Sequence, residues 1–316
     1  MDNIKIKMEE ERIIEIRNLS KQFRNKGNIA KAVDDISLDI FKGKIYGFVG
    51  HNGSGKTTTI KMILGLIRPS SGEIKVNWGG HVKNYSLGYV PERPVLYDDM
   101  YPLEYLIYVG ELSGLDTETS RKNAENYIKI FGLVEAKDKK IKTFSSGMKQ
   151  KILISQALLH SPSLMILDEP TTALDPVEQK KLLDILKNLS KENGSTIIMS
   201  SHHLQELEMI ADHVFLFENG KIILDSPIKE LKKSIKGQVE IKTTNCEKVF
   251  NILRSQLSII NMIIVGDKII IKDDRLDSAS FKNKIIQTII NSGEDVLSIV
   301  TSSKSFYDSI MEKLKK

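Results

Sequence analysis

The stretch from Lys44 to Thr57, KIYGFVGHNGSGKT, decides the fold of this chain. It begins with an apolar run typical of a buried strand and ends in a match to the phosphate-binding pattern G-x-x-x-x-G-K-[ST]. An ordinary glycine-rich turn is the alternative, but it requires neither the preceding strand nor a following helix. Such a helix, with one buried face, is predicted because apolar residues recur at helical spacing at Ile60, Ile63, Leu64 and Ile67.

The residue types of this loop suit phosphate binding. Its glycines allow backbone N–H groups to converge on phosphate oxygens, and the N-terminus of the following helix adds partial positive charge. Lys56 is expected to reach the β- and γ-phosphates of a nucleoside triphosphate, and the Thr57 hydroxyl is expected to ligate Mg²⁺. The predicted nucleotide contacts are Gly50, His51, Asn52, Gly53, Ser54, Gly55, Lys56, Thr57 and Thr58.

A second stretch, Leu164 to Glu169, is an apolar strand that ends in two carboxylates. Asp168 is expected to hold Mg²⁺ through water. Glu169 lies one residue beyond the strand end, where it could act on an attacking water as general base. Acidic residues at strand ends are common by chance, but the position of this pair behind a phosphate-binding loop favours the functional interpretation.

The first 224 residues are predicted to be α/β, with a helical subdomain at about residues 92–162 inserted in the α/β core. The helical signals are Pro102–Leu112, Ser120–Phe131 and Ser146–His160. The strand signals are Arg12–Arg17, Ile36–Ile40, Lys44–Val49, Glu73–Val76, Leu87–Val90, Leu164–Leu167, Thr196–Met199 and Val214–Phe217.

Beyond Asp225 the patterns predict a small α+β domain of ferredoxin-like βαββαβ order, followed by a final helix. We therefore expect one domain over residues 1–230 and an accessory domain, regulatory or dimer-supporting, over residues 231–316. The predicted elements are strand Val239–Thr243, helix Glu247–Gln256, strands Asn261–Val265 and Lys268–Lys272, helix Ser278–Asn291, strand Asp295–Val300 and final helix Lys304–Leu314.

Composition narrows the function classes. The net charge of +5 is not concentrated in a basic stripe, so nucleic-acid binding is not favoured. No apolar run approaches the roughly 18 residues of a membrane helix, and Met1–Glu11 lacks the apolar core of a secretory signal. Cys246 is the only cysteine, so an intrachain disulfide is impossible, which fits a reducing cytosol.

Three further motifs, together with the two sites, make residues 12–225 resemble an ABC (ATP-binding cassette) ATPase. Phe144-Ser145-Ser146-Gly147-Met148 occupies the place of the family's LSGGQ signature. Ala173-Leu174-Asp175 resembles its D-loop, and Ser201-His202 resembles its switch histidine. A GTPase or a small-molecule kinase would share the phosphate loop but not this set.

The resemblance implies that two cassettes face head to tail and that each ATP lies between one phosphate loop and the other subunit's signature. Ser145, Ser146, Gly147 and Asp175 would then contact nucleotide, while His202 would contact the γ-phosphate and the water. Phe23, expected in the loop after the first strand, would stack on adenine, where the family often uses tyrosine. A core or surface phenylalanine is the alternative for Phe23.

The chain also departs from the family pattern. Ser146 replaces a glycine and Met148 a glutamine, although the serine and second glycine that touch phosphate remain. Glu92 aligns with the Q-loop glutamine; it could ligate Mg²⁺, yet it adds negative charge beside the γ-phosphate. Because Glu92 lies at the start of the helical subdomain, it could couple the nucleotide state to whatever that subdomain touches.

The leading hypothesis is the energy subunit of a membrane exporter at the cytoplasmic face of the membrane, working with a separate permease. The stretch Pro102–Leu106 and the ending Ser303–Leu314 resemble exporters of antibiotics, bacteriocin peptides or similar cargo. A soluble ABC ATPase acting on ribosomes or nucleic acid and a non-hydrolytic nucleotide sensor are the alternatives. A permease helix could bind along apolar side chains that could equally be subdomain core: Tyr97, Met100, Tyr101, Leu106 and Tyr108.

Overall fold

The structure is a computed structural model that describes residues 11–25, 28–77, 87–93, 95–235 and 238–301. They form two compact units, one ending at Pro227 and the other beginning at Ile228, close to the expected boundary at residue 230. The predicted final helix, Lys304–Leu314, lies outside the described residues. Within them, no helix combines the length and apolar character needed to span a membrane.

A mostly parallel sheet forms the centre of the first unit. Its strands are β3 (Ile45–Val49), β5 (Leu87–Val90), β6 (Leu164–Asp168), β7 (Thr196–Ser201), β8 (His213–Glu218) and β9 (Lys221–Pro227). Their order is β5-β6-β7-β3-β8-β9, and only β9 runs antiparallel to its neighbour. Strands β3, β6 and β7 are buried along their whole length, as expected of parallel strands covered on both faces.

A second, antiparallel sheet has the order β2-β1-β4 and consists of β1 (Arg12–Asn25), β2 (Asn28–Phe41) and β4 (Ser71–Val76). Strands β1 and β2 are much longer than predicted because register shifts interrupt the apolar alternation while the pairing continues. Phe23 pairs with Ala30 inside this ladder. The expectation that Phe23 lies in a loop after the first strand was therefore wrong.

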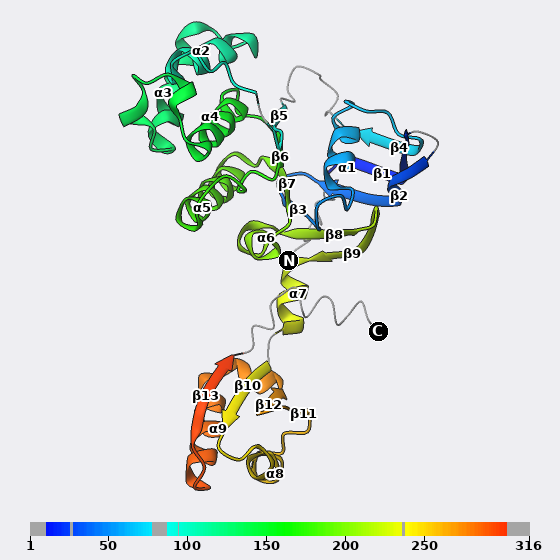
Figure 1. Ribbon diagram of the computed structural model, residues 1–316, viewed down its shortest axis with the longest axis vertical. Coiled ribbons are helices and arrows are strands. Elements are labelled where there is room, and N and C mark those ends of the chain that lie inside the picture. The colour runs from blue at the N-terminus through cyan, green and yellow to red at the C-terminus, as the bar shows by residue number, and fades with distance from the viewer. Residues whose placement is uncertain (1–10, 26–27, 78–86, 94, 236–237, 302–316) are drawn as a thin grey trace, which may run out of the picture. The chain divides into compact units, whose positions relative to one another are not determined.

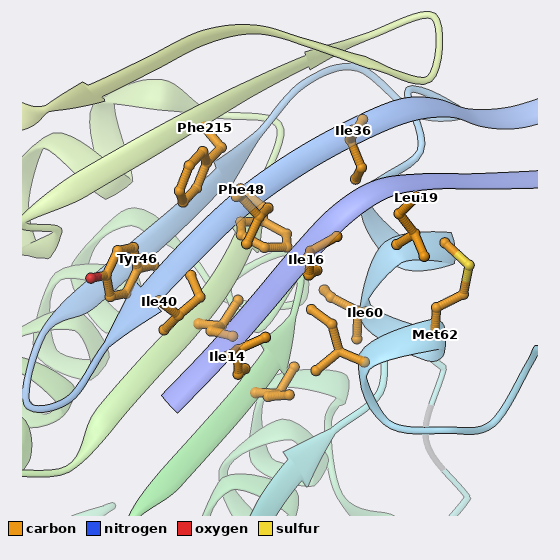
Figure 2. Close-up of a cluster of buried hydrophobic side chains, with 14 of the residues drawn as sticks. Ile14, Ile16, Leu19, Ile36, Ile40, Tyr46, Phe48, Ile60, Met62 and Phe215 are labelled. Carbon is orange, nitrogen blue, oxygen red and sulfur yellow. The ribbon is translucent and has the colours of Figure 1, made fainter. Parts of the chain in front are cut away.

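The two sheets share one core with α1 (Lys56–Ile63), the helix that follows the phosphate loop. Figure 2 shows side chains of β1, β2, β3, β8 and α1 directed toward one another. On the opposite face of β3, Gly47 allows α6 (Leu204–Ile210) to approach, since an added Cβ would lie 2.8 Å from Leu207 Cδ1. This packing on both faces holds the carboxyl end of β3, where the loop begins. The labelled core residues are Ile14, Ile16, Leu19, Ile36, Ile40, Tyr46, Phe48, Ile60, Met62 and Phe215.

The helical layer of the first unit comprises α2 (Pro102–Leu112), α3 (Thr117–Ile130), α4 (Ser146–Leu158) and two 3-10 turns, η2 (Val134–Ala136) and η3 (Ile141–Thr143). Helix α3 begins earlier than predicted because the Asp116 side chain accepts a hydrogen bond from the Thr119 N–H. Helices α5 (Pro176–Asn193) and α6 were not predicted from the sequence. Figure 1 shows α1 and α4 on opposite sides of β6 and β7.

The second unit contains α7 (Ile228–Ile235), β10 (Gln238–Thr243), α8 (Cys246–Leu257), β11 (Met262–Val265), β12 (Lys268–Lys272), η4 (Asp274–Asp277), α9 (Ala279–Asn291) and β13 (Val296–Thr301). From β10 onward its helices and strands follow the predicted βαββαβ order, and the sheet order is β11-β12-β10-β13. Alternate residues of β10 and β12, such as Ile241 and Ile269, are buried in a core that also includes Val249 of α8 and Ile285 of α9. The predicted ferredoxin-like fold class is confirmed.

Candidate nucleotide-binding site

The phosphate loop joins β3 to α1 and requires glycine where its backbone turns. Gly55 has a φ of +112°, and a Cβ there would lie 2.8 Å from the Ala32 carbonyl oxygen. Gly53 has a φ of +83° and open space around the position of a Cβ. A side chain is thus excluded at Gly55 by strain and contact together, whereas at Gly53 the backbone conformation alone favours glycine.

Lys56 lies inside the loop rather than in solvent, with 5% of its surface exposed. Its Nζ donates to the Gly50 carbonyl oxygen at 2.6 Å and to that of His51 at 3.3 Å. The same Nζ lies 3.4 Å from Glu169 Oε1. A buried ammonium that carbonyl oxygens orient next to a carboxylate is placed to bind phosphate oxygens.

Asp168 ends β6 and is 1% exposed. Its Oδ1 accepts from Ser200 Oγ at 2.6 Å and from Thr57 Oγ1 at 3.1 Å, while its buried Oδ2 has no hydrogen-bond partner among the described residues. Burial, the largest cause, raises the pKa of Asp168, and Glu92 and Glu169 raise it further, whereas the hydrogen bonds from Ser200 and Thr57 lower it. A carboxylate with a free buried oxygen beside a threonine hydroxyl fits Mg²⁺, which prefers oxygen ligands.

Glu169 follows the strand in a left-handed conformation, with φ of +52°. Its N–H donates to Ser200 Oγ at 2.8 Å, which holds this uncommon backbone in place. Its Oε2 accepts a hydrogen bond from Nδ1 of His202 at 2.8 Å. Since β7 lies between β6 and β3, the sheet order brings Glu169, His202 and the phosphate loop to one edge of the sheet.

Glu92 follows β5 and joins the same edge. A cavity of about 340 Å³ is lined by residues of α1, of β5 and the segment after it, and by Asp168. Burial raises the pKa of Tyr89 in this cavity, and the carboxylates of Asp168 and Glu92 raise it further. Glu92 therefore lies in one cavity with the two other predicted Mg²⁺ ligands. The lining residues are Thr57, Lys61, Tyr89, Pro91, Glu92, Arg93 and Asp168.

The remaining loop residues differ in exposure. His51, Asn52 and Gly53 are exposed, Ser54 is buried, and Thr58 is half-buried at the start of α1. The exposed His51 ring contacts its neighbour's backbone, with Nδ1 2.8 Å from the Asn52 carbonyl oxygen. His51, Asn52 and Gly53 are therefore open to solvent, whereas the loop residues that follow them are more buried.

The structure does not gather the signature and D-loop residues at this edge. Ser145 and Asp175 are exposed N-caps: Ser145 accepts from the Met148 N–H, and Asp175 accepts from those of Val177 and Glu178. Ser146 is exposed, and Gly147 packs near Leu174, to which an added Cβ would approach within 3.2 Å. Ser145 caps α4, Ser146 and Gly147 begin it, and Asp175 caps α5; Figure 1 shows α4 on the other side of β6 and β7 from α1.

Phe23 is 44% exposed on β1, and the Lys21 ammonium lies 5.1 Å from its ring centroid. It is therefore not a core residue, and one face of its ring already contacts a cation.

Ser200 was absent from the predicted site. It pairs with Asp168 across the β6–β7 ladder and contacts both carboxylate residues. The signal in the sequence is slight: two serines, Ser200 and Ser201, end an otherwise apolar strand.

Comparisons with known proteins agree with this geometry. The family model described as "ABC transporter" matches residues 33–172. The chain is 35% identical to the bacitracin transport ATP-binding protein BcrA of Bacillus licheniformis over 94% of this chain and 95% of that protein. It is 31% identical to the linearmycin resistance ATP-binding protein LnrL of Bacillus subtilis, over 88% and 89%.

Solved structures give the same result. An ATP-binding subunit of an ABC transporter is 30% identical, with a TM-score of 0.61 over 70% of this chain and 92% of that one. A dimeric ATP-binding cassette in a post-hydrolysis state with ADP and Pi has a TM-score of 0.62 over 68% and 99%. At 23% identity the latter supports the fold alone. With its relatives matched over nearly their whole length, the chain belongs to the ABC transporter family of ATP-binding proteins.

Proposed function

We propose that this chain binds and hydrolyses ATP to drive a membrane transporter that exports an antibiotic, peptide or similar cargo through a separate permease. The observation that carries the proposal is the convergence of Lys56, Asp168, Glu169 and His202 at the carboxyl ends of β3, β6 and β7. Each residue type has the chemistry that phosphoanhydride hydrolysis needs: Lys56 follows β3, Asp168 and Glu169 lie at the end of β6, and His202 follows β7.

In this mechanism the loop N–H groups and Lys56 bind the phosphates. Thr57, Glu92 and Asp168 would hold Mg²⁺, whose charge offsets that of the phosphates. Glu169 accepts a proton from the attacking water, and His202, hydrogen-bonded to Oε2, orients that carboxylate. Phe23 presents an exposed ring that could stack on adenine.

A second copy of this chain would complete the site. Ser145, Ser146, Gly147 and Asp175 lie at helix N-termini, Ser145 and Asp175 as exposed caps of α4 and α5, where N–H groups favour an anion. Ser145 and Asp175 are exposed, and α4 lies on the other side of β6 and β7 from α1, which supports a role at the partner's nucleotide.

The class of cargo follows from the relatives, which are named for bacitracin transport and linearmycin resistance. With such a permease partner, the chain would lie at the cytoplasmic face of the membrane. The ATP-driven cassette would comprise residues 1–230, and residues 231–316 would act as a regulatory or dimer-supporting accessory domain. The hypothesis of a ribosome- or nucleic-acid-directed ATPase receives no support from these relatives.

The decisive test is Glu169→Gln. The variant keeps the size of the side chain but cannot take the proton, so phosphate release should fall by about 10²–10⁴-fold. ATP binding should persist, and light scattering should detect an ATP-dependent dimer. Glu125→Gln, an exposed change on α3, is the matched control and should hydrolyse ATP normally. Normal hydrolysis by Glu169→Gln would refute the assigned base.

The transporter assignment has its own test. Purification of the protein from native membranes in mild detergent should recover an integral membrane protein. If none is recovered, the permease proposal fails while the ATPase proposal stands.

A further inference from the structure

A buried carboxylate on α6 lies beside the proposed site without taking part in it. Glu206 is 8% exposed, and its Oε2 accepts two hydrogen bonds, from Thr171 Oγ1 at 2.7 Å and from Ser201 Oγ at 2.7 Å. Burying a carboxylate is costly unless hydrogen bonds satisfy it. Both bonds involve a charged acceptor, which makes them stronger than bonds between neutral groups.

The two hydroxyls belong to the segments that carry Glu169 and His202. Thr171 follows Glu169 by two residues, and Ser201 immediately precedes His202. Both hydroxyl residues are buried, and Ser201 Oγ also accepts the His203 N–H at 2.9 Å. One carboxylate oxygen therefore joins the segment after β6 to the last residue of β7.

A second hydrogen bond spans the same two segments. His202 Nδ1 donates to Glu169 Oε2 at 2.8 Å, but the His202 side chain is 35% exposed. The imidazole also packs against the His203 ring, with the two ring centroids 3.9 Å apart. The buried contacts of Thr171 and Ser201 with Glu206 restrain the backbone on both sides of this pair.

We infer that Glu206 is a positioning residue for ATP hydrolysis, fixing the separation of the segments that bear the general base and the histidine. The inference rests on the proposed function, because it needs Glu169 to be the base. Glu206 does not line the cavity that holds Thr57, Glu92 and Asp168. It acts on the geometry of the Glu169–His202 pair and not on nucleotide affinity.

The test compares Glu206→Ala with Glu206→Gln under single-turnover conditions. Misplacement of a catalytic group by about 1 Å can cost about 10²-fold, so Glu206→Ala should lower the hydrolysis rate by about 10–100-fold. The Kd for Mg·ATP should stay within about threefold, since the phosphate-binding groups are untouched. Glu206→Gln keeps an oxygen that can accept both hydroxyls and should restore the rate to within about threefold. The control is Gln205→Ala, an exposed change on the same helix that should leave the rate unaltered.

A double-mutant cycle separates positioning from a general loss of structure. If Glu206 acts through the histidine, adding Glu206→Ala to His202→Ala should lower the rate by less than about twofold more. If Glu206→Ala lowers the rate of the His202→Ala variant by the same factor as it lowers the rate of the parent protein, the inference is wrong. A normal rate in Glu206→Ala would also overturn it.

Two further outcomes are distinguishable. If Glu206→Ala does not fold, Thr171→Val and Ser201→Ala each remove one contact and should lower the rate with unchanged Kd; normal rates in both would overturn the inference. Normal hydrolysis in Glu169→Gln would instead refute the assignment of Glu169 as the general base, on which this inference rests.

Discussion

Removal of the Ser200 hydroxyl tests how the edge of the sheet is held together. Ser200 Oγ donates to Asp168 Oδ1 at 2.6 Å and accepts the Glu169 N–H at 2.8 Å, and the side chain is fully buried. Ser200→Ala removes a hydrogen bond to a charged group, which contributes about 1.5–3 kcal/mol. It also leaves a buried N–H without its acceptor, which costs about 1–3 kcal/mol. The free energy of unfolding should therefore fall by about 2.5–6 kcal/mol.

The loss should depend on pH. Burial raises the pKa of Asp168 above its ordinary value of 3.8, and the Ser200 hydrogen bond opposes that rise, so Ser200→Ala raises the pKa further. A carboxyl whose pKa is higher in the folded state binds more protons when folded, so stability falls as pH rises from the unfolded pKa through the folded one. The difference between Ser200→Ala and the parent protein should thus be larger at about pH 7.5 than at about pH 4, close to the ordinary pKa of the group.

Urea unfolding of the nucleotide-free protein, followed by circular dichroism at both pH values, measures the two effects. Ser155→Ala is the matched control, because Ser155 is equally buried but its hydroxyl bonds to the Lys151 carbonyl of its own helix. That carbonyl keeps its helical N–H partner, so the control should lose less than about 1 kcal/mol. If Ser200→Ala loses no more than Ser155→Ala, or loses the same amount at both pH values, the proposed role of Ser200 is wrong.

Two other changes probe the nucleotide site. Glu92→Gln should leave the ATPase rate within about tenfold of the parent protein, since an amide oxygen can replace one carboxylate ligand; complete loss of hydrolysis would show that the carboxylate is essential. Gly55→Ala should reduce ATP affinity at least about tenfold, because the new Cβ meets the Ala32 carbonyl at 2.8 Å in a left-handed backbone that costs about 1–2 kcal/mol. Gly114→Ala, also at positive φ but with open space around it, is its control in a nucleotide-binding titration, and equal affinities in the two variants would contradict the steric argument.

Part of the site was readable from local sequence because its chemistry is local. The loop from Gly50 to Thr57 needs a strand before it, a helix after it and glycine where φ is positive, and all three conditions lie within one short stretch. Asp168 and Glu169 end an apolar strand in the same direct way. The ferredoxin-like order of the second unit was also readable, because its short helices and strands have clear periodicity.

Other features depend on contacts between distant segments. Register shifts in β1 hide its length from the apolar pattern, so the placement of Phe23 in a loop was wrong. Helix α5 was not predicted, and so the role of Asp175 as its N-cap was not predicted either. Ser200 and Glu206 carry no motif of their own. The pairing of β6 with β7 brings Ser200 to Asp168, and the packing of α6 brings Glu206 to Thr171 and Ser201.

The sequence by itself determined that this chain has a phosphate-binding loop, a strand ending in two carboxylates and the motifs of an ABC ATPase. Only the tertiary structure decided that Glu169 is left-handed, hydrogen-bonded to Ser200 and joined to His202 across two strands. The physical reason is that backbone preference and apolar periodicity act over a few residues, whereas the order of parallel strands brings together residues far apart in the chain. The end of a strand can be predicted from its own residues. The side chains of other strands that contact this end cannot be predicted in that way.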